Sequence, residues 1–254
     1  MVGGHALNIS MFLSALAWLA LAVSTTSAGE MSVAVAANFV EPAKTLADAF
    51  HAATGDTAVI SPGASGQLFT QITHGAPFEV FLSADAERPQ ALIAGGYAVA
   101  QSRFTYAVGR LALYSATPGL VDGQGLVLKR TDLRAVAIAD PAVAPYGVAA
   151  EESMRKLGVY EALKPKIVKG ASIAQAYQFV ATGAAEIGFV AQSQIVNVKG
   201  GSRWLVPEAL HAPIEQQAVL LKAGANDPAA QKFLDFLKSP AARSIIARYG
   251  YDLR

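Results

Sequence analysis

Four segments of the sequence place small and hydrogen-bonding residues where an expected strand gives way to an expected helix. They cover residues 36–39, 61–66, 141–147 and 170–173. A helix start exposes backbone N–H groups that lack a partner within the helix, and it carries a partial positive charge. A small anion placed there would meet both the donors and the dipole. These segments therefore favour the capture of an anion by uncharged donors.

None of the four segments contains lysine or arginine. A fully ionised oxyanion only accepts hydrogen bonds, so N–H groups, the Ser65 hydroxyl and the Asn38 amide could hold it without a countercharge. A partly protonated anion such as phosphate would also need an acceptor. Asp85 and Asp140 stand near loops, although Asp140 before a proline is typical of a turn. Each segment also has an ordinary structural interpretation, such as Asn38 as a helix cap, and only the occurrence of four together favours a site.

Residues 63–67 are superficially similar to a nucleophile elbow centred on Ser65. That motif requires glycine two residues after the serine, where this chain has Gln67. His211 has no carboxylate placed to orient it as a base, and the loop lacks the Gly-Lys-Ser/Thr motif of a phosphate-binding loop. A serine hydrolase using Ser65 is therefore a remote alternative, and we expect no catalytic residue and no cofactor. The sequence has no cysteine and its histidines are scattered, which argues against a metal held by protein ligands.

Alternating strands and helices position the four segments. The hydrophobic pattern predicts strands at 32–37, 57–60, 79–83, 106–114, 136–139, 167–169, 186–190 and 218–221, and helices at 41–51, 67–73, 87–94, 148–156, 172–182, 228–238 and 240–248. This alternation implies mainly parallel sheets covered by helices on both faces. In such α/β sheets, strand-to-helix junctions lie at the carboxyl ends of strands, where ligands bind.

The composition describes a chain that can bury a large core. Of 254 residues, 53% are hydrophobic and 15% are charged, and the formal net charge of +1 gives no field that would attract nucleic acid. No low-complexity linker divides the chain, which favours two lobes joined by strands. Residues 106–114 and 216–221 are the predicted crossings between these lobes.

The first 28 residues are typical of an export signal. Residues 11–23 are apolar except for Ser14, and small residues lead to Ala28. The apolar run is shorter than a membrane-spanning helix requires. Because no lysine or arginine precedes it, an uncleaved anchor or a misassigned start stays as the alternative.

The sequence also resembles the periplasmic molybdate-binding proteins of ABC-type importers along essentially the whole chain after residue 28. The segment Gly75-Ala76-Pro77 followed by residues 80–85 is fairly specific to that family. The other similar segments are residues 35–39, 61–66, 102–107, 144–147, 188–191 and 248–251.

This resemblance implies an α/β fold of the type II periplasmic-binding-protein class, with two lobes built on central mixed sheets and joined by a hinge. Lobe 1 is expected to comprise 29–108 plus 219–254, and lobe 2 to comprise 109–218. The implied function is that of a periplasmic monomer that captures molybdate, and tungstate alongside it, between the lobes and delivers it to an ABC transporter permease. Molybdenum would enter only as the bound oxyanion, with no direct protein ligands.

The residues that the resemblance assigns to the oxyanion are Ala37, Asn38, Ser65, Tyr146 and Ile173, the last two through their backbone N–H groups. Ala37 lacks the hydroxyl that some relatives carry there, and Ala191 stands where one branch of the family has a tyrosine. Binding of another tetrahedral oxyanion, such as sulfate or phosphate, is the nearest alternative. The ligand-sensing domain of a regulator shares the architecture, but the export-like start argues against it.

Overall fold

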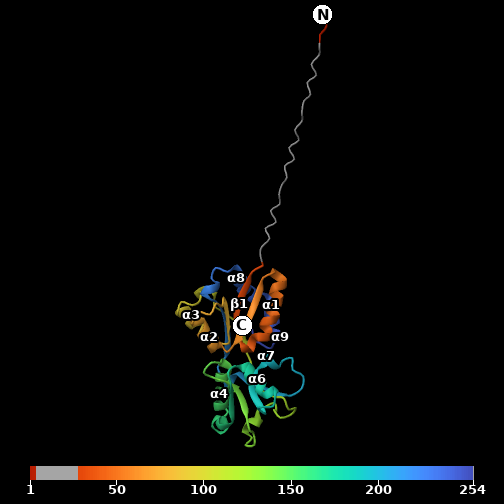
Figure 1. The fold of residues 1–254 in the computed structure, drawn as a ribbon. Coiled ribbons are helices and arrows are strands. Elements are labelled where there is room, and N and C mark those ends of the chain that lie inside the picture. The colour runs from red at the N-terminus through yellow and green to blue at the C-terminus, as the bar shows by residue number, and fades with distance from the viewer. Residues whose placement is uncertain (4–27, 254) are drawn as a thin grey trace.

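The structure, a computed structural model, describes residues 1–3 and 28–253, so nearly all of the predicted export signal lies outside the described residues. Within the described part, the strands form two five-stranded sheets. Figure 1 shows the orange start and the blue end of the chain together around the upper sheet, with the green-to-cyan middle around the lower one. The predicted two-lobed α/β fold is confirmed. No helix in the described ranges is both long and apolar enough to cross a membrane.

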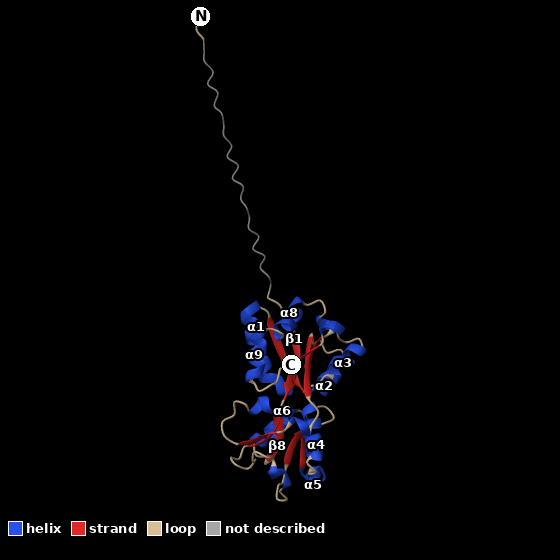
Figure 2. Ribbon diagram, turned by 180° about the vertical axis from the view of Figure 1, so that it is seen from behind, coloured by secondary structure: helices blue, strands red, loops and turns tan. Residues whose placement is uncertain are grey.

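The first lobe contains β1 (Glu30–Ala36), β2 (Thr57–Gly63), β3 (Val80–Ser83), β4 (Phe104–Gly109) and β10 (Ile214–Leu220), in the order β2-β1-β3-β10-β4. The first three strands are parallel, whereas β10 runs antiparallel to β3 and β4. Around the sheet lie α1 (Val40–Thr54), α2 (Ser65–Thr73), α3 (Glu87–Ala94), α8 (Pro228–Leu237) and α9 (Pro240–Arg248), visible as blue ribbons on both sides of the red strands in Figure 2. Phe39, Phe50 and Phe233 are fully buried in its core.

The second lobe contains β5 (Leu111–Ser115), β6 (Val136–Ala139), β7 (Ile167–Gly170), β8 (Ile187–Ala191) and β9 (Ser202–Leu205), in the order β7-β6-β8-β5-β9. Here β6, β7 and β8 are parallel, and β5 runs antiparallel to β8 and β9. Its helices are α4 (Pro145–Lys156), α5 (Tyr160–Leu163), α6 (Ile173–Ala181) and α7 (Gln192–Ile195). The carboxyl ends of the three parallel strands lead into α4, α6 and α7, which places these helix starts at one edge of the sheet.

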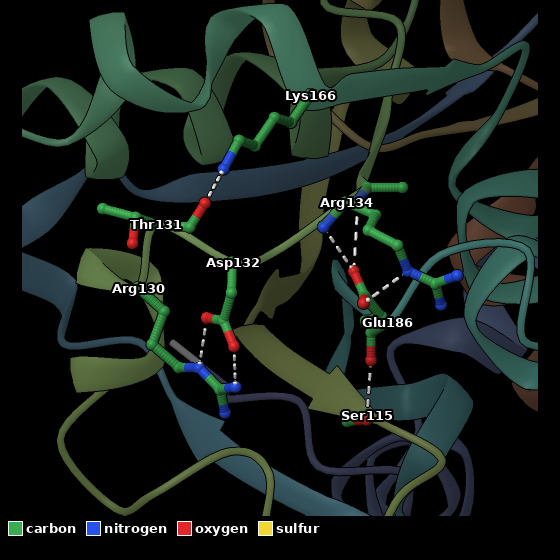
Figure 3. A network of polar contacts seen from close by, with 8 residues as sticks. Ser115, Arg130, Thr131, Asp132, Arg134, Lys166 and Glu186 are labelled. Carbon is green, nitrogen blue, oxygen red and sulfur yellow. Dashed lines mark hydrogen bonds and ion pairs between the residues drawn. The ribbon is translucent and has the colours of Figure 1, made fainter.

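Contacts of charged side chains stabilise the opposite edge of the second sheet, where β6 and β8 begin. The Glu186 carboxylate accepts the backbone N–H of Arg134 at 2.7 Å and that of Ala135 at 3.2 Å, and the Ser115 hydroxyl donates to the Glu186 carbonyl at 2.6 Å. Arg130 pairs with Asp132 on the loop just before β6, as Figure 3 shows. We call Arg130, Asp132, Arg134 and Glu186 the outer charged network. These residues stabilise the second lobe at the edge opposite its helix starts.

Two sequence predictions about strands are wrong. The single strand expected at 106–114 is two strands, because the chain passes from the first sheet to the second at Arg110, between β4 and β5. A continuous apolar run cannot reveal such a change of sheet. The strand expected at 218–221 begins instead at Ile214, and β9 was not predicted. Buried glutamines in β10 interrupt its apolar pattern, and β9 is too short to show an alternation.

The predicted helices are all present, but α1, α2 and α4 begin earlier than predicted, and the short helices α5 and α7 were not predicted. Helix α2 starts at Ser65 instead of residue 67, and α4 starts at Pro145 instead of residue 148. Proline fits the first helical position because it has no N–H to leave unpaired. The earlier starts place Ser65 and Tyr146 in the first turns of their helices.

Candidate functional site

The four predicted helix-start segments meet between the two lobes. The Gly66 N–H donates to the Val143 carbonyl at 2.9 Å, which joins the second segment to the third. Helix α7 joins the first segment to the fourth: the Ser193 hydroxyl donates to the Asn38 carbonyl at 2.8 Å, and the Gln194 amide donates to the Ile173 carbonyl at 3.2 Å. The lobes are therefore in direct contact, and the segments face a common interior.

The predicted ligand residues are buried at this junction. Exposed fractions are 1% for Ser65 and Tyr146 and 3% for Asn38 and Ile173. Ala37 is partly buried and packs against the core of the second lobe. Ordinary helix starts face water, so burial of all these helix starts at one place is a property of an interior site.

Two backbone donors at the junction have no partner in their own helices. Tyr146 is the second residue of α4 and Ile173 is the first residue of α6, so neither N–H reaches a carbonyl four residues earlier within its helix. No backbone hydrogen bond found among the described residues uses either N–H. Buried N–H groups are nearly always paired, so these two positions fit a ligand that brings acceptors.

The Ser65 side chain is oriented to donate. Its oxygen accepts the backbone N–H of Ala84 at 3.0 Å, which fixes the hydroxyl and leaves its hydrogen for another acceptor. His211 Nδ1 lies 2.7 Å from the Ala212 carbonyl, and no hydrogen bond among the described residues joins the His211 side chain to Ser65.

Asp85 and Asp140, the two carboxylates near these segments, bond to other groups of the protein. Asp85 accepts from the Ser83 hydroxyl and pairs with Arg88. Asp140 accepts the N–H of Ala142 at 3.2 Å, which is the turn role that its position before proline predicted.

The Asn38 amide has a different role from the one expected. Its Nδ2 donates to Gln216 Oε1 and to the Tyr251 hydroxyl, both at 2.9 Å. Both amide hydrogens are thus used inside the protein, and the donor that Asn38 can still offer to a ligand is its backbone N–H. Asn38 forms a short 3₁₀ turn, η1 (Ala37–Phe39), between β1 and α1, which leaves that N–H at a helix start.

A network of neutral side chains surrounds the junction, and the sequence did not predict it. Gln216 Oε1 also accepts from the Tyr106 hydroxyl at 3.0 Å, and Gln216 Nε2 donates to the Tyr146 hydroxyl at 3.2 Å. The Tyr251 hydroxyl donates to the Asn38 carbonyl at 2.8 Å. We call Asn38, Tyr106, Tyr146, Gln216 and Tyr251 the inner neutral network. Four of its members lie in segments that resemble the molybdate-binding family (35–39, 102–107, 144–147 and 248–251), whereas Gln216 lies in none of them.

The network stays uncharged over the physiological pH range. Burial raises the pKa of Tyr106 and of Tyr146 well above the ordinary value, and nearby tyrosines raise both further. Burial also raises the pKa of Tyr251, although its hydrogen bonds with Ser193 and Asn38 act in the opposite direction. The phenols therefore remain neutral donors.

A cavity of about 450 Å³ opens beside the junction, against three of the four segments. Its lining includes Ala37 and Asn38 from the first segment, Gly63 from the second and Ser172 from the fourth. A second cavity of about 480 Å³ involves Pro145 at the start of α4. Ser65, Tyr146 and Ile173 line neither cavity, so a small solute would reach their O–H and N–H groups only after a local opening of the lobes.

Comparison with known proteins agrees with this chemistry. Residues 31–252 match the family model described as bacterial extracellular solute-binding protein. The molybdate-binding protein ModA of Rhodobacter capsulatus is 61% identical over 225 residues, which cover 89% of each chain. ModA of Azotobacter vinelandii is 52% identical over 237 residues, covering 92% of this chain and 94% of that protein.

Solved structures of two other binding proteins have the same fold. The periplasmic molybdate-binding protein of Azotobacter vinelandii superposes with a TM-score of 0.86 at 43% identity, covering 88% of this chain and 99% of that one. The sulfate-binding protein SubI of Mycobacterium tuberculosis H37Rv has a TM-score of 0.75 at 13% identity and covers 88% of this chain and 86% of its own. At 13% identity, the similarity to SubI shows only that the two proteins share a fold.

Proposed function

Because this chain belongs to the family of bacterial extracellular solute-binding proteins, we propose that it captures molybdate between its lobes and passes it to the permease of an ABC importer. The observation that carries the proposal is the meeting of four helix starts in a buried, uncharged interior. The 61% identity to a molybdate-binding protein over 89% of both chains selects molybdate among the tetrahedral oxyanions.

The proposed ligands of the oxyanion are the Ser65 hydroxyl and the backbone N–H groups of Asn38, Tyr146 and Ile173, with Ala37 lining the adjacent cavity. A tetrahedral dianion presents four acceptor oxygens, and helix starts supply both donors and favourable dipoles. Molybdenum would be held through these oxygens, without a bond to any protein atom. Tungstate has the same shape and charge and is proposed as a second ligand.

Discrimination against phosphate would follow from the missing acceptor. A phosphate that keeps one proton needs a hydrogen-bond acceptor, and the nearby Asp85 already pairs with Arg88. Sulfate, in contrast, is an ionised dianion like molybdate. Selection against it would depend on the fit of the closed cage to the larger oxyanion, because both ions offer only acceptors.

The lobe boundaries are part of this proposal. All of β10 pairs with β3 and β4, which supports moving the second boundary from residue 218 to a point before Ile214. The hinge would then comprise Arg110 and the segment 206–213. We further propose that residues 1–28 direct export to the periplasm and that the exported protein acts as a monomer.

Calorimetry of the chain without residues 1–28 against molybdate, tungstate, sulfate and phosphate tests the function. Molybdate at 100 times its dissociation constant should stabilise the fold by about 2.7 kcal/mol. We expect tungstate to do the same, sulfate to do so weakly and phosphate not at all. Absence of heat and of a melting shift with molybdate would contradict the proposal.

A further inference from the structure

The geometry points to Gln216 as a positioning residue: it ties the anion-binding segments of the two lobes together and so sets the affinity without contacting the anion. This inference rests on the proposed binding site. It concerns a residue of β10 that lies outside all four helix-start segments.

One amide group links donors from opposite lobes. Gln216 is fully buried, and its Oε1 accepts from Asn38 of the first lobe at 2.9 Å. Its Nε2 donates to the Tyr146 hydroxyl of the second lobe at 3.2 Å. Asn38 and Tyr146 each offer a backbone N–H to the proposed ligand, so Gln216 fixes two donor-bearing residues through their side chains.

Local backbone geometry presents Gln216 to this junction. The pairing of β10 with β4 shifts register between Gln216 and Gln217, as a β-bulge does, and a bulge can redirect a side chain. Among the described residues, the Gln217 side chain bonds within the first lobe, to Arg103 at 2.9 Å and to Thr105 at 3.1 Å. Two adjacent glutamines thus have different tasks, one between the lobes and one inside a lobe.

Gly109 provides the room for this contact at the hinge. A Cβ added to Gly109 would lie 2.6 Å from Gln216 Nε2 and closer still to the Tyr146 hydroxyl. Gly109 is the last residue of β4, immediately before the chain passes to the second lobe. The contact between Gln216 and Tyr146 therefore packs directly against the crossing about which the lobes would move.

A hydrogen bond between lobes contributes only when the lobes are together. Separation of the lobes would break the bond from Gln216 to Tyr146, so the bond favours the closed form. Because the ligand needs donors from both lobes, its apparent affinity scales with the closed fraction. Removing the bond should weaken binding although every atom that touches the anion remains.

The test compares Gln216→Met with Gln217→Met. Both variants lose a buried or nearly buried amide on the same strand, so both should lower the melting temperature. We expect the molybdate dissociation constant to rise about tenfold or more for Q216M and to stay within about twofold for Q217M. Equal affinities for Q216M and the unaltered protein, or equal losses in both variants, would overturn the inference.

A second variant keeps the test decisive if Q216M does not fold. Tyr146→Phe removes the hydroxyl that Gln216 reaches and keeps the backbone N–H. Its affinity for molybdate should also fall. The double variant should lose no more affinity than Q216M alone, because both changes remove the same bond between Gln216 and Tyr146. Unchanged affinity in Y146F, or fully additive losses, would count against the inference, whereas an unaltered protein that does not bind molybdate would contradict the proposed function instead.

Closure can also be measured without ligand. The sequence has no cysteine, so spin labels can be attached specifically to cysteines introduced at the exposed residues Lys44 and Lys164, one on each lobe. We expect Q216M to shift the ligand-free distance distribution toward separated lobes and Q217M to leave it unchanged. A residue with a merely structural role would not move this distribution, and an unmoved distribution in Q216M would contradict our assignment.

Discussion

The outer charged network and the inner neutral network perform similar structural tasks with opposite chemistry. At the outer edge of the second lobe, Arg130 pairs with Asp132, and Arg134 pairs with Glu186 at 2.9 Å (Figure 3). At the junction of the lobes, neutral amides and phenols bond to one another in the inner network. The chain thus uses ion pairs where water screens them and neutral groups where we propose that the dianion binds.

The difference follows from the cost of burying charge. An exposed ion pair contributes about 0–1 kcal/mol and needs no special surroundings. A buried cation at the junction would attract the dianion strongly, but it would be costly to leave unpaired whenever the ligand departs. Neutral donors cost less when vacant, so they suit a site that must fill and empty repeatedly.

Adding a negative charge to the interior should have the largest effect. Ser65→Asp places a carboxylate at a buried position beside the proposed dianion, where like charges repel with a cost of several kcal/mol. We expect molybdate affinity to fall by more than about 100-fold, measured by calorimetry. Far-ultraviolet circular dichroism checks that the variant is folded. Near-normal binding by a folded variant would show that the anion lies elsewhere.

Removing one neutral donor should have a smaller effect. Ser65→Ala deletes a hydroxyl expected to donate to a desolvated oxygen of the ligand, so binding should weaken by about 1–3 kcal/mol. The matched control is Ser239→Ala at the start of α9, outside the four segments, because the Ser239 oxygen accepts the Ala242 N–H at 3.2 Å as a helix cap. This control should lower stability by about 1 kcal/mol with little change in affinity. Equal affinity losses would mean that helix integrity, and not donation by Ser65, governs binding.

The sequence predicted those parts of the site that depend on local signals. Ser172 is a typical helix cap, and the change from strand to helix locates each segment, although α4 was expected to begin at residue 148 and begins at Pro145. Gln216 could not be found in this way, because its partners Asn38 and Tyr146 lie 178 and 70 residues away. Because Gln216 is polar, the apolar pattern of β10 begins only after it, and the start of this strand at Ile214 was not predicted. The burial of Gln216 is tolerated because tertiary hydrogen bonds satisfy its amide, and hydrophobic periodicity contains no information about such bonds.

Weakening the outer charged network should alter stability and not binding. Glu186→Gln keeps one acceptor for the N–H groups of Arg134 and Ala135 but loses the charge-assisted contacts, so we expect a loss of about 1 kcal/mol in urea unfolding. Asp132→Asn, in the more exposed pair, should have a smaller effect. Molybdate affinity should be unchanged in both variants. A change of affinity would couple the outer edge to the site and weaken the separation between the two networks.

A change of pH should affect the stability that the outer network provides and leave molybdate binding unchanged. Since burial raises the pKa of the network tyrosines, molybdate affinity should stay constant between about pH 6 and pH 9. The outer network behaves differently: the hydrogen bond from Arg130 lowers the pKa of Asp132 from 3.8 to about 2. A carboxyl with a lowered pKa stabilises the fold above its unfolded value, and that contribution is lost as pH falls from 3.8 through about 2. Unfolding curves in acid measure this loss. A titration of affinity between about pH 6 and pH 9 would instead reveal an ionisable group at the junction and would contradict a wholly neutral site.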